Sequence, residues 1–158
     1  MDMKTSPLER AGFVLGIGLG GFADGIILHQ LLQWHHMVCT TATCEVHTLA
    51  EFKKQTFQDG LFHLAMWLTV IGGVVMLFRA LARSPLEASG KTLVGSLFVG
   101  WGCFNLIEGI INHHILGLHH VISGSPHQLT ADLAFLAVSL VLVIFGVNRC
   151  IRERTAAR

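Results

Sequence analysis

The stretch Asp24-Gly25-Ile26-Ile27-Leu28-His29-Gln30-Leu31-Leu32-Gln33-Trp34-His35-His36 is written twice in this chain. Eighty-four residues later the chain reads Glu108-Gly109-Ile110-Ile111-Asn112-His113-His114-Ile115-Leu116-Gly117-Leu118-His119-His120. Both copies follow the pattern acid-Gly-Ile-Ile-x-His-x5-His-His, and the same offset places Gly16 on Gly100 upstream. The pattern predicts an internal duplication whose repeated feature is a set of polar, metal-capable side chains in apolar surroundings.

The composition is typical of a membrane protein. Of 158 residues 52% are hydrophobic and 13% are charged, and the mean hydropathy is +0.59. A helix needs roughly 20 apolar residues to cross a bilayer, and four segments meet that requirement: 11–34, 60–81, 92–116 and 131–148. We therefore expect one domain, residues 1–158. Its fold class is all-α: an integral membrane four-helix bundle of two parallel two-helix repeats, 11–81 and 92–149.

The basic residues predict the orientation. Nine of the eleven Lys and Arg residues lie before the first segment, between the second and third segments, or after the fourth, which is the same side of the membrane as both termini. Only Lys53 and Lys54 lie on the other side. The positive-inside rule then places both termini in the cytoplasm and the loops after residues 34 and 116 outside. A net charge of +1, spread over membrane flanks, gives no support for nucleic-acid binding.

Helical rise sorts the ionisable side chains by depth, with every candidate in the outer half of the membrane. Asp24 and Glu108 fall ~16 Å from the outer boundary, and His29, His63 and His113 fall roughly 6–9 Å from it. Intramembrane ionisable residues usually have a functional partner. We predict these metal ligands: His29, His35, His36, His63, His113, His119 and His120. We predict these residues to orient the ligands or relay protons: Asp24, Asp59, Glu108, His114 and Asp132.

The helical wheel spreads these side chains over a broad sector. On a straight α-helix Asp24 and His35 lie close together, about 120–140° from His29 and His36. Asp59 is expected to open the second helix, as Asp132 opens the fourth.

The first outer loop contains two cysteines on the side expected to be oxidising. Cys39 and Cys44 are five residues apart, so a disulfide or free thiols fit better than a metal site with His47, because the spacing matches no closed zinc motif. We do not expect His47 or His127, both in outer loops, to be ligands.

Three chemistries suit the polar side chains. Imidazoles and carboxylates bind copper, iron or zinc, and such a centre supports a metal-dependent oxidoreductase with a membrane or periplasmic redox partner. Two histidines at equal depth, among His29, His63 and His113, suit a b-type haem that carries electrons. Asp24 and Glu108 suit a proton or metal-ion pathway. A fourth interpretation is a non-catalytic subunit of a membrane complex, in which the polar side chains only satisfy one another's hydrogen bonds.

Hydrolase and kinase functions are excluded, because the chain has no nucleophile elbow, phosphate loop or zincin motif. The oligomeric state stays open.

Five motifs carry a resemblance that covers nearly the whole chain: 22–26 (FADGI), 28–30 (LHQ), 33–37 (QWHHM), 59–63 (DGLFH) and 116–120 (LGLHH). With them the chain resembles a family of small bacterial membrane proteins defined as a domain of unknown function. The resemblance implies a four-helix protein of the bacterial inner membrane and supplies no activity. The histidine doublets also look like the boxes of membrane di-iron hydroxylases and desaturases. However, the H-x-x-H-H and H-x-x-x-H spacings are absent around His35 and His119, and the expected orientation puts these residues on the opposite face.

Overall fold

The computed structural model describes residues 5–38, 45–83 and 89–156. Over these residues the chain is all-helical, and four helices are long and apolar enough to cross a membrane. The all-α membrane fold expected from the sequence is confirmed. The elements in chain order are α1 (Pro7–Ala23), η1 (Asp24–Leu31), α2 (Leu49–Arg83), α3 (Gly90–Glu108), η3 (Gly109–Ile115) and α4 (Gln128–Ala156).

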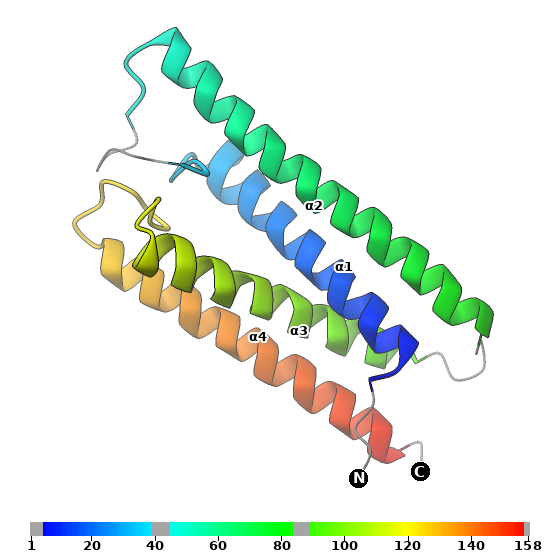
Figure 1. The fold of residues 1–158 in the computed structure, drawn as a ribbon. Coiled ribbons are helices and arrows are strands. Elements are labelled where there is room, and N and C mark those ends of the chain that lie inside the picture. Colours follow the sequence, from blue (N-terminus) through cyan, green and yellow to red (C-terminus); the bar gives the residue numbers. More distant parts are fainter. Residues whose placement is uncertain (1–4, 39–44, 84–88, 157–158) are drawn as a thin grey trace.

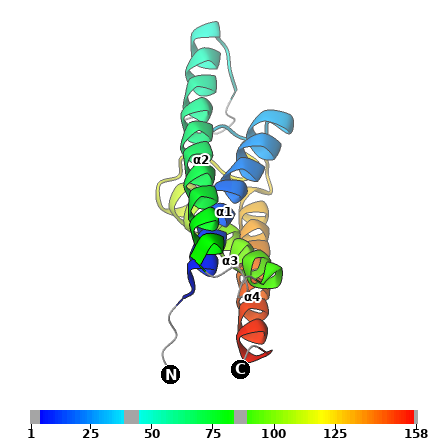
Figure 2. The same ribbon diagram turned by 90° about the vertical axis from the view of Figure 1, so that its right-hand side faces the viewer.

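The helices are ordered α2, α1, α3, α4 across the molecule. The central pair α1 and α3 pack against each other, α2 packs on α1, and α4 packs on α3. Helices α1 and α3 run in the same direction, and α4 runs back alongside α3. The start of α1 and the end of α4 therefore lie at the same end of the molecule (Figure 1). Figure 2 shows that α2 extends beyond the other helices at one end. Half of the most apolar window of α1 and η1 is buried, compared with 11% for α2 and 17% for α4, so the outer helices leave most of their apolar surface exposed.

Close packing of α1 on α3 depends on glycine. A Cβ atom at Gly16 would collide with the Leu97 carbonyl oxygen, and one at Gly100 would collide with that of Phe13. These glycines are equivalent in the repeat. The missing side chain of each glycine leaves the space that the backbone of the other half occupies. Small residues allow such close approach where no hydrophobic drive exists between helices.

The outer helices begin earlier than the sequence indicated. Helix α2 starts at Leu49, where Thr48 and Glu51 exchange side-chain to backbone hydrogen bonds of 2.9 and 3.2 Å as a capping box. Helix α4 starts at Gln128. The expectation that Asp59 and Asp132 open their helices is therefore wrong. Both carboxylates lie inside a helix, and both are buried.

The central helices also end differently from the expected straight α-helix. Each passes into a π-helix, η1 after Ala23 and η3 after Glu108. Beyond each π-helix one residue adopts a left-handed conformation, Gln33 with φ 52° and Gly117 with φ 58°. The next amide bonds back across the turn, from Trp34 to the Leu28 carbonyl and from Leu118 to that of Asn112. This arrangement resembles the Schellman ending of a helix.

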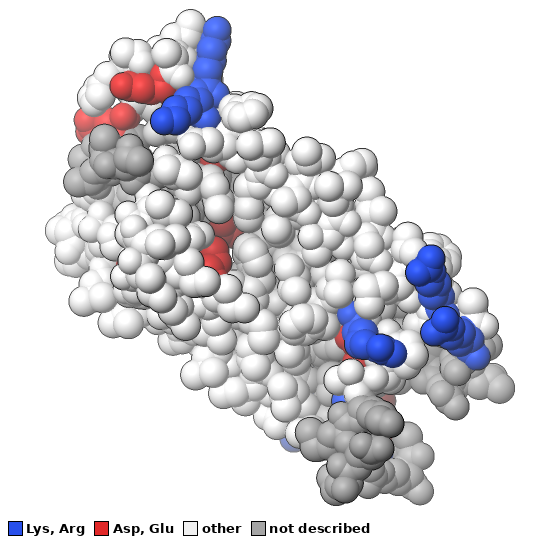
Figure 3. All heavy atoms as spheres, in the orientation of Figure 1, with Lys and Arg blue, Asp and Glu red and all other residues white. Residues whose placement is uncertain are grey.

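The Lys and Arg residues on the visible face fit a membrane-embedded middle. In Figure 3 Lys and Arg appear only toward the two ends of the molecule, separated by a broad surface without them. A cavity of about 590 Å³ lies between the helices at the end where α1 begins, beside the ion pair of Glu9 with Arg154. Its lining includes none of the histidines, so it is separate from the site described next.

Candidate metal centre

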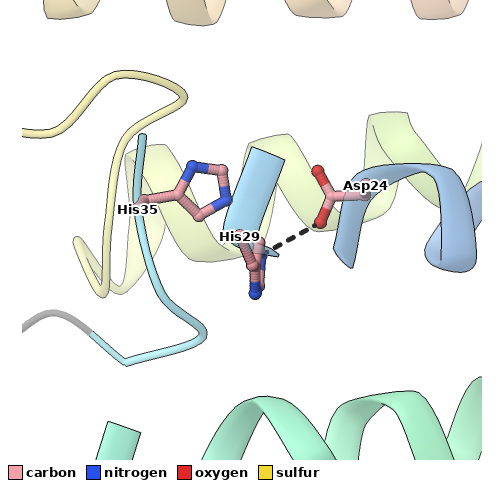
Figure 4. A group of neighbouring side chains, drawn as sticks. All are labelled: Asp24, His29 and His35. Carbon is pink, nitrogen blue, oxygen red and sulfur yellow. Dashed lines mark ion pairs between the residues drawn. The ribbon is translucent and has the colours of Figure 1, made fainter. Parts of the chain in front are cut away.

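Three buried side chains of the first half converge where α1 becomes η1. We call Asp24, His29 and His35 group one; their ligand atoms all lie within 4.8 Å of one another. The Nε2 atom of His29 lies 3.2 Å from Oδ2 of Asp24. Figure 4 shows the three side chains pointing toward one another, with His35 coming from the loop after η1.

The second half forms an equivalent arrangement. We call Glu108, His113 and His119 group two; these three residues are also buried and their ligand atoms also lie within 4.8 Å. The Oε1 atom of Glu108 lies 3.3 Å from Nε2 of His113 and 2.9 Å from Nε2 of His119. All three residues are the equivalents, at the same offset, of the group one residues.

The two groups touch and form one cluster. The rings of His35 and His119 are stacked, with centroids 4.4 Å apart and an interplanar angle of 5°. The His29 ring lies 6.1 Å from that of His119, and the His35 ring lies 6.2 Å from that of His113. Two metal positions would therefore be close neighbours within a single centre.

Each half has an aspartate behind its cluster histidine. In the first half His29 Nδ1 donates to Oδ1 of Asp59 at 3.2 Å, and His36 Nδ1 donates to Oδ2 at 2.7 Å. In the second half the equivalent aspartate is Asp132. It lies 3.3 Å from Nδ1 of His113 and accepts a 2.6 Å bond from His120. A carboxylate behind a ligating imidazole is a frequent device that fixes the ring and its tautomer.

Backbone carbonyls hold the two loop histidines, and they do so crosswise. His35 Nδ1 donates to the carbonyl of Val121 at 2.9 Å, and His119 Nδ1 donates to the carbonyl of Met37 at 3.0 Å. Met37 and Val121 are equivalent positions of the repeat. Each loop histidine is thus oriented by the loop of the other half.

The electrostatics favour neutral imidazole at His35. Burial, together with the nearby imidazoles of His119 and His29, lowers the pKa of His35 to about 3. Its Nδ1 atom holds the proton that is donated to Val121, so the Nε2 lone pair faces the cluster. A neutral imidazole with a free lone pair is the form that binds a metal ion.

Several polar atoms of the cluster are buried without a hydrogen-bond partner: His29 Nε2, His35 Nε2, His113 Nδ1, His113 Nε2 and Glu108 Oε2. An unsatisfied buried polar atom costs about 1–3 kcal/mol, and native proteins contain few of them. They lie in the two groups of side chains whose arrangement could hold a metal ion.

Sequence reasoning placed some of these residues differently. It put Asp24 and Glu108 deeper than the histidines, whereas each lies in one group with two of them. It gave His36 and His120 a ligand role, whereas both contact the aspartates behind the cluster. His63 stacks on Phe22 at 6.2 Å outside both groups, and His114 is exposed. Cys39 and Cys44 lie outside the described residues.

The π-helix explains the difference. Residues five apart, such as Asp24 and His29, lie roughly 140° apart around an α-helix of 3.6 residues per turn. The wider π-turn, bonded from i to i+5, brings them to the same side. The repeated acid-x4-His spacing was the available signal. Sequence patterns gave no indication of the carbonyls of Met37 and Val121.

Comparison with known proteins agrees with the membrane architecture. Residues 11–153 match the model of the family described as "Predicted membrane protein (DUF2243)". The chain belongs to this family. No curated protein and no solved structure matched the chain. Family membership supports a location in the lipid bilayer and leaves the chemistry to be argued from the cluster itself.

Proposed function

We propose that this is an integral membrane metalloprotein with a dinuclear transition-metal centre in the outer half of the bilayer. Group one holds one ion and group two holds the other. The observation that carries the proposal is the convergence of four buried atoms without a hydrogen-bond partner: Nε2 of His29, His35 and His113, and Oε2 of Glu108. Imidazole nitrogens and carboxylate oxygens with a lone pair are donors of the kind that metal ions bind.

The spacing of the donors supports the proposal. Metal–nitrogen and metal–oxygen bonds of ~2.0–2.1 Å place two tetrahedral ligands about 3.3 Å apart. The separations within the groups are 3.2 Å for Asp24 with His29, and 3.3 and 2.9 Å for Glu108 with His113 and His119. These three separations match that spacing, and all ligand atoms of each group lie within 4.8 Å of one another.

The charge of the cluster also supports two ions. Ionised Asp24, Asp59, Glu108 and Asp132 carry four negative charges, and every ion pair described for them is with a histidine. Isolated buried carboxylates are costly in a membrane interior. Two divalent cations would balance the four carboxylates while all imidazoles stay neutral.

The ligand set narrows the choice of metal. Each group supplies two imidazoles and one carboxylate, a set used by non-haem iron and by zinc, and it contains no thiolate or thioether. Iron would make the centre redox-active, as a metal-dependent oxidoreductase requires. Copper remains within the proposal because imidazole also binds it.

A proton-storing network is the second candidate, and a specific observation favours it. Both nitrogens of His119 lie within 3.0 Å of acceptor oxygens, on Met37 and Glu108. Without a metal, a proton must lie between Nε2 of His119 and Oε1 of Glu108 for this contact to be a hydrogen bond. Four imidazolium ions would also balance four carboxylates.

The bis-histidine haem reading has less support from the geometry. The cluster rings lie against one another, with centroids 4.4–6.2 Å apart, and the stacked pair His35 and His119 leaves no slot for a porphyrin between them.

Elemental analysis of protein purified without chelators tests the proposal. We expect about two equivalents of iron, zinc or copper per chain and no Soret absorption. X-ray absorption should show nitrogen and oxygen neighbours at ~2.0–2.1 Å. Protein that stays metal-free after gentle extraction and after incubation with Fe²⁺, Zn²⁺ and Cu²⁺ would refute the metal centre and favour the proton network. A Soret band would favour haem.

A further inference from the structure

The crossed hydrogen bonds connect the two metal positions. Resting on the proposed function, we propose that the positions are energetically coupled: an ion in one group strengthens binding in the other, and Asp59 and Asp132 are the positioning residues that transmit the effect.

The first connection runs from group one to group two. His29, a group one ligand, donates to Oδ1 of Asp59, and the same oxygen accepts the amide of Met37 at 2.8 Å. The carbonyl of Met37 then accepts Nδ1 of His119, a group two ligand. An ion that fixes His29 therefore fixes, through one carboxylate and one backbone residue, the ring that the second ion needs.

The second connection is the equivalent path in the opposite direction. Asp132 Oδ1 lies 3.3 Å from His113 of group two and accepts the Val121 amide at 2.9 Å. The carbonyl of Val121 accepts Nδ1 of His35, a group one ligand. Every link is a direct contact between named atoms, which is the kind of physical network that coupling between sites requires.

Charge and order decide the sign of the coupling. Two neighbouring cations repel each other, which opposes joint occupancy. However, one divalent ion among four carboxylates leaves two negative charges uncompensated, so the second ion still meets a net attraction. The first ion also orders the loop that presents the second ion's histidine, so less conformational freedom remains to be lost. The remaining attraction keeps the repulsion from excluding the second ion, and the ordering effect favours positive coupling, for which the typical range is about 5–150-fold.

Zn²⁺ loading of the intact chain gives the first test. Metal-stripped protein is mixed with one equivalent of Zn²⁺, and native mass spectrometry counts chains with no, one and two ions. We expect mostly empty and doubly loaded chains, with fewer singly loaded chains than a statistical distribution gives. A statistical or larger singly loaded fraction overturns the coupling. Failure to retain Zn²⁺ at any concentration would instead refute the metal centre.

A variant pair tests the path. In the His29→Ala background, where only group two can hold an ion, adding Asp59→Asn should weaken Zn²⁺ binding by about tenfold, within the usual size of such couplings. Asp59 touches no group two ligand. If Asp59 acted only on group one, the Asp59→Asn change would therefore leave Zn²⁺ binding by group two unchanged. The mirror experiment adds Asp132→Asn to His113→Ala.

Matched controls keep the test independent of stability. Exposed Glu51→Gln on the same helix should leave Zn²⁺ binding unchanged in the His29→Ala background. Thermal unfolding of each variant without metal shows whether it is folded. Unchanged group two affinity in a folded Asp59→Asn variant would overturn the path through Met37.

Discussion

The two halves of the molecule use the same kinds of ligand, but they hold the acidic ligand differently. In the first half Asp24 lies 3.2 Å from one imidazole, that of His29. In the second half Glu108 lies within 3.3 Å of two imidazoles and also accepts a 3.2 Å bond from Asn112. The residue equivalent to Asn112 is Leu28, which has no polar group to offer.

The outer helices differ in the opposite sense. Beside the π-helix of the first half stands His63, against Gly25, whereas Leu136 occupies the corresponding place against Gly109. The ligands are thus alike while the second half fixes its carboxylate more firmly. A donor that is already oriented loses less freedom on binding, so group two should be the tighter of two similar positions.

The largest effect should come from removing the histidine common to both π-helices. We expect His29→Ala and His113→Ala each to lower bound metal by about half or more, because a direct metal ligand is lost. Metal per chain, measured by elemental analysis, checks this result, and His113→Ala should cost more than His29→Ala.

Two exposed histidines serve as controls for that pair. His47 lies in the loop before α2 and His127 in the loop before α4, both outside the cluster. Their alanine variants should keep the full metal content. Loss of metal in these loop variants, with full content in His29→Ala, would place the site elsewhere.

An intermediate effect should come from the two acids. Considered by depth alone, Asp24→Asn and Glu108→Gln should keep much of the metal, since both acids would stand behind the ligands. Their contacts within the groups now predict weaker binding, by about 10–100-fold even for a residue one shell away. Competition against a chromophoric chelator measures the affinities. Glu108→Gln should have the greater effect, because Glu108 contacts two imidazoles; equal retention in both variants would restore the depth-based assignment.

The smallest effect concerns the left-handed residue after each π-helix. Gly117 adopts φ 58° freely, whereas Gln33 adopts φ 52° with a side chain, which costs of order 1 kcal/mol. Gly117→Gln should therefore lower the unfolding midpoint slightly, since no atom within 4 Å would obstruct the added Cβ. Gln33→Gly should raise the midpoint or leave it unchanged, because glycine's extra freedom in the unfolded chain offsets part of the relief. Thermal unfolding in detergent measures both; a large loss in Gln33→Gly would show that the Gln33 side chain itself is needed.

Much of this arrangement was predictable because it depends on repetition and hydropathy. Apolar length gave the four helices, and the repeat singled out His29 and His113. The remainder was not predictable, because depth estimates assume a straight α-helix. One π-turn brings Asp24 to the same side of the helix as His29. The left-handed residue Gln33 then turns the chain so that His35 lies near both side chains. The crossed carbonyls join residues more than eighty positions apart, and no local pattern encodes that distance.

The crossed hydrogen bonds also set an order of events during biosynthesis. The carbonyl that orients His35 belongs to a residue 86 positions later in the chain. At a translation rate of about 5–20 residues per second, the first half waits roughly 4–17 seconds for that partner. During this interval its ligands are present but not yet oriented, so an ion captured then would be held loosely and released readily. Metal loading should therefore follow synthesis of the second half, and a chain that stops after α2 should remain empty.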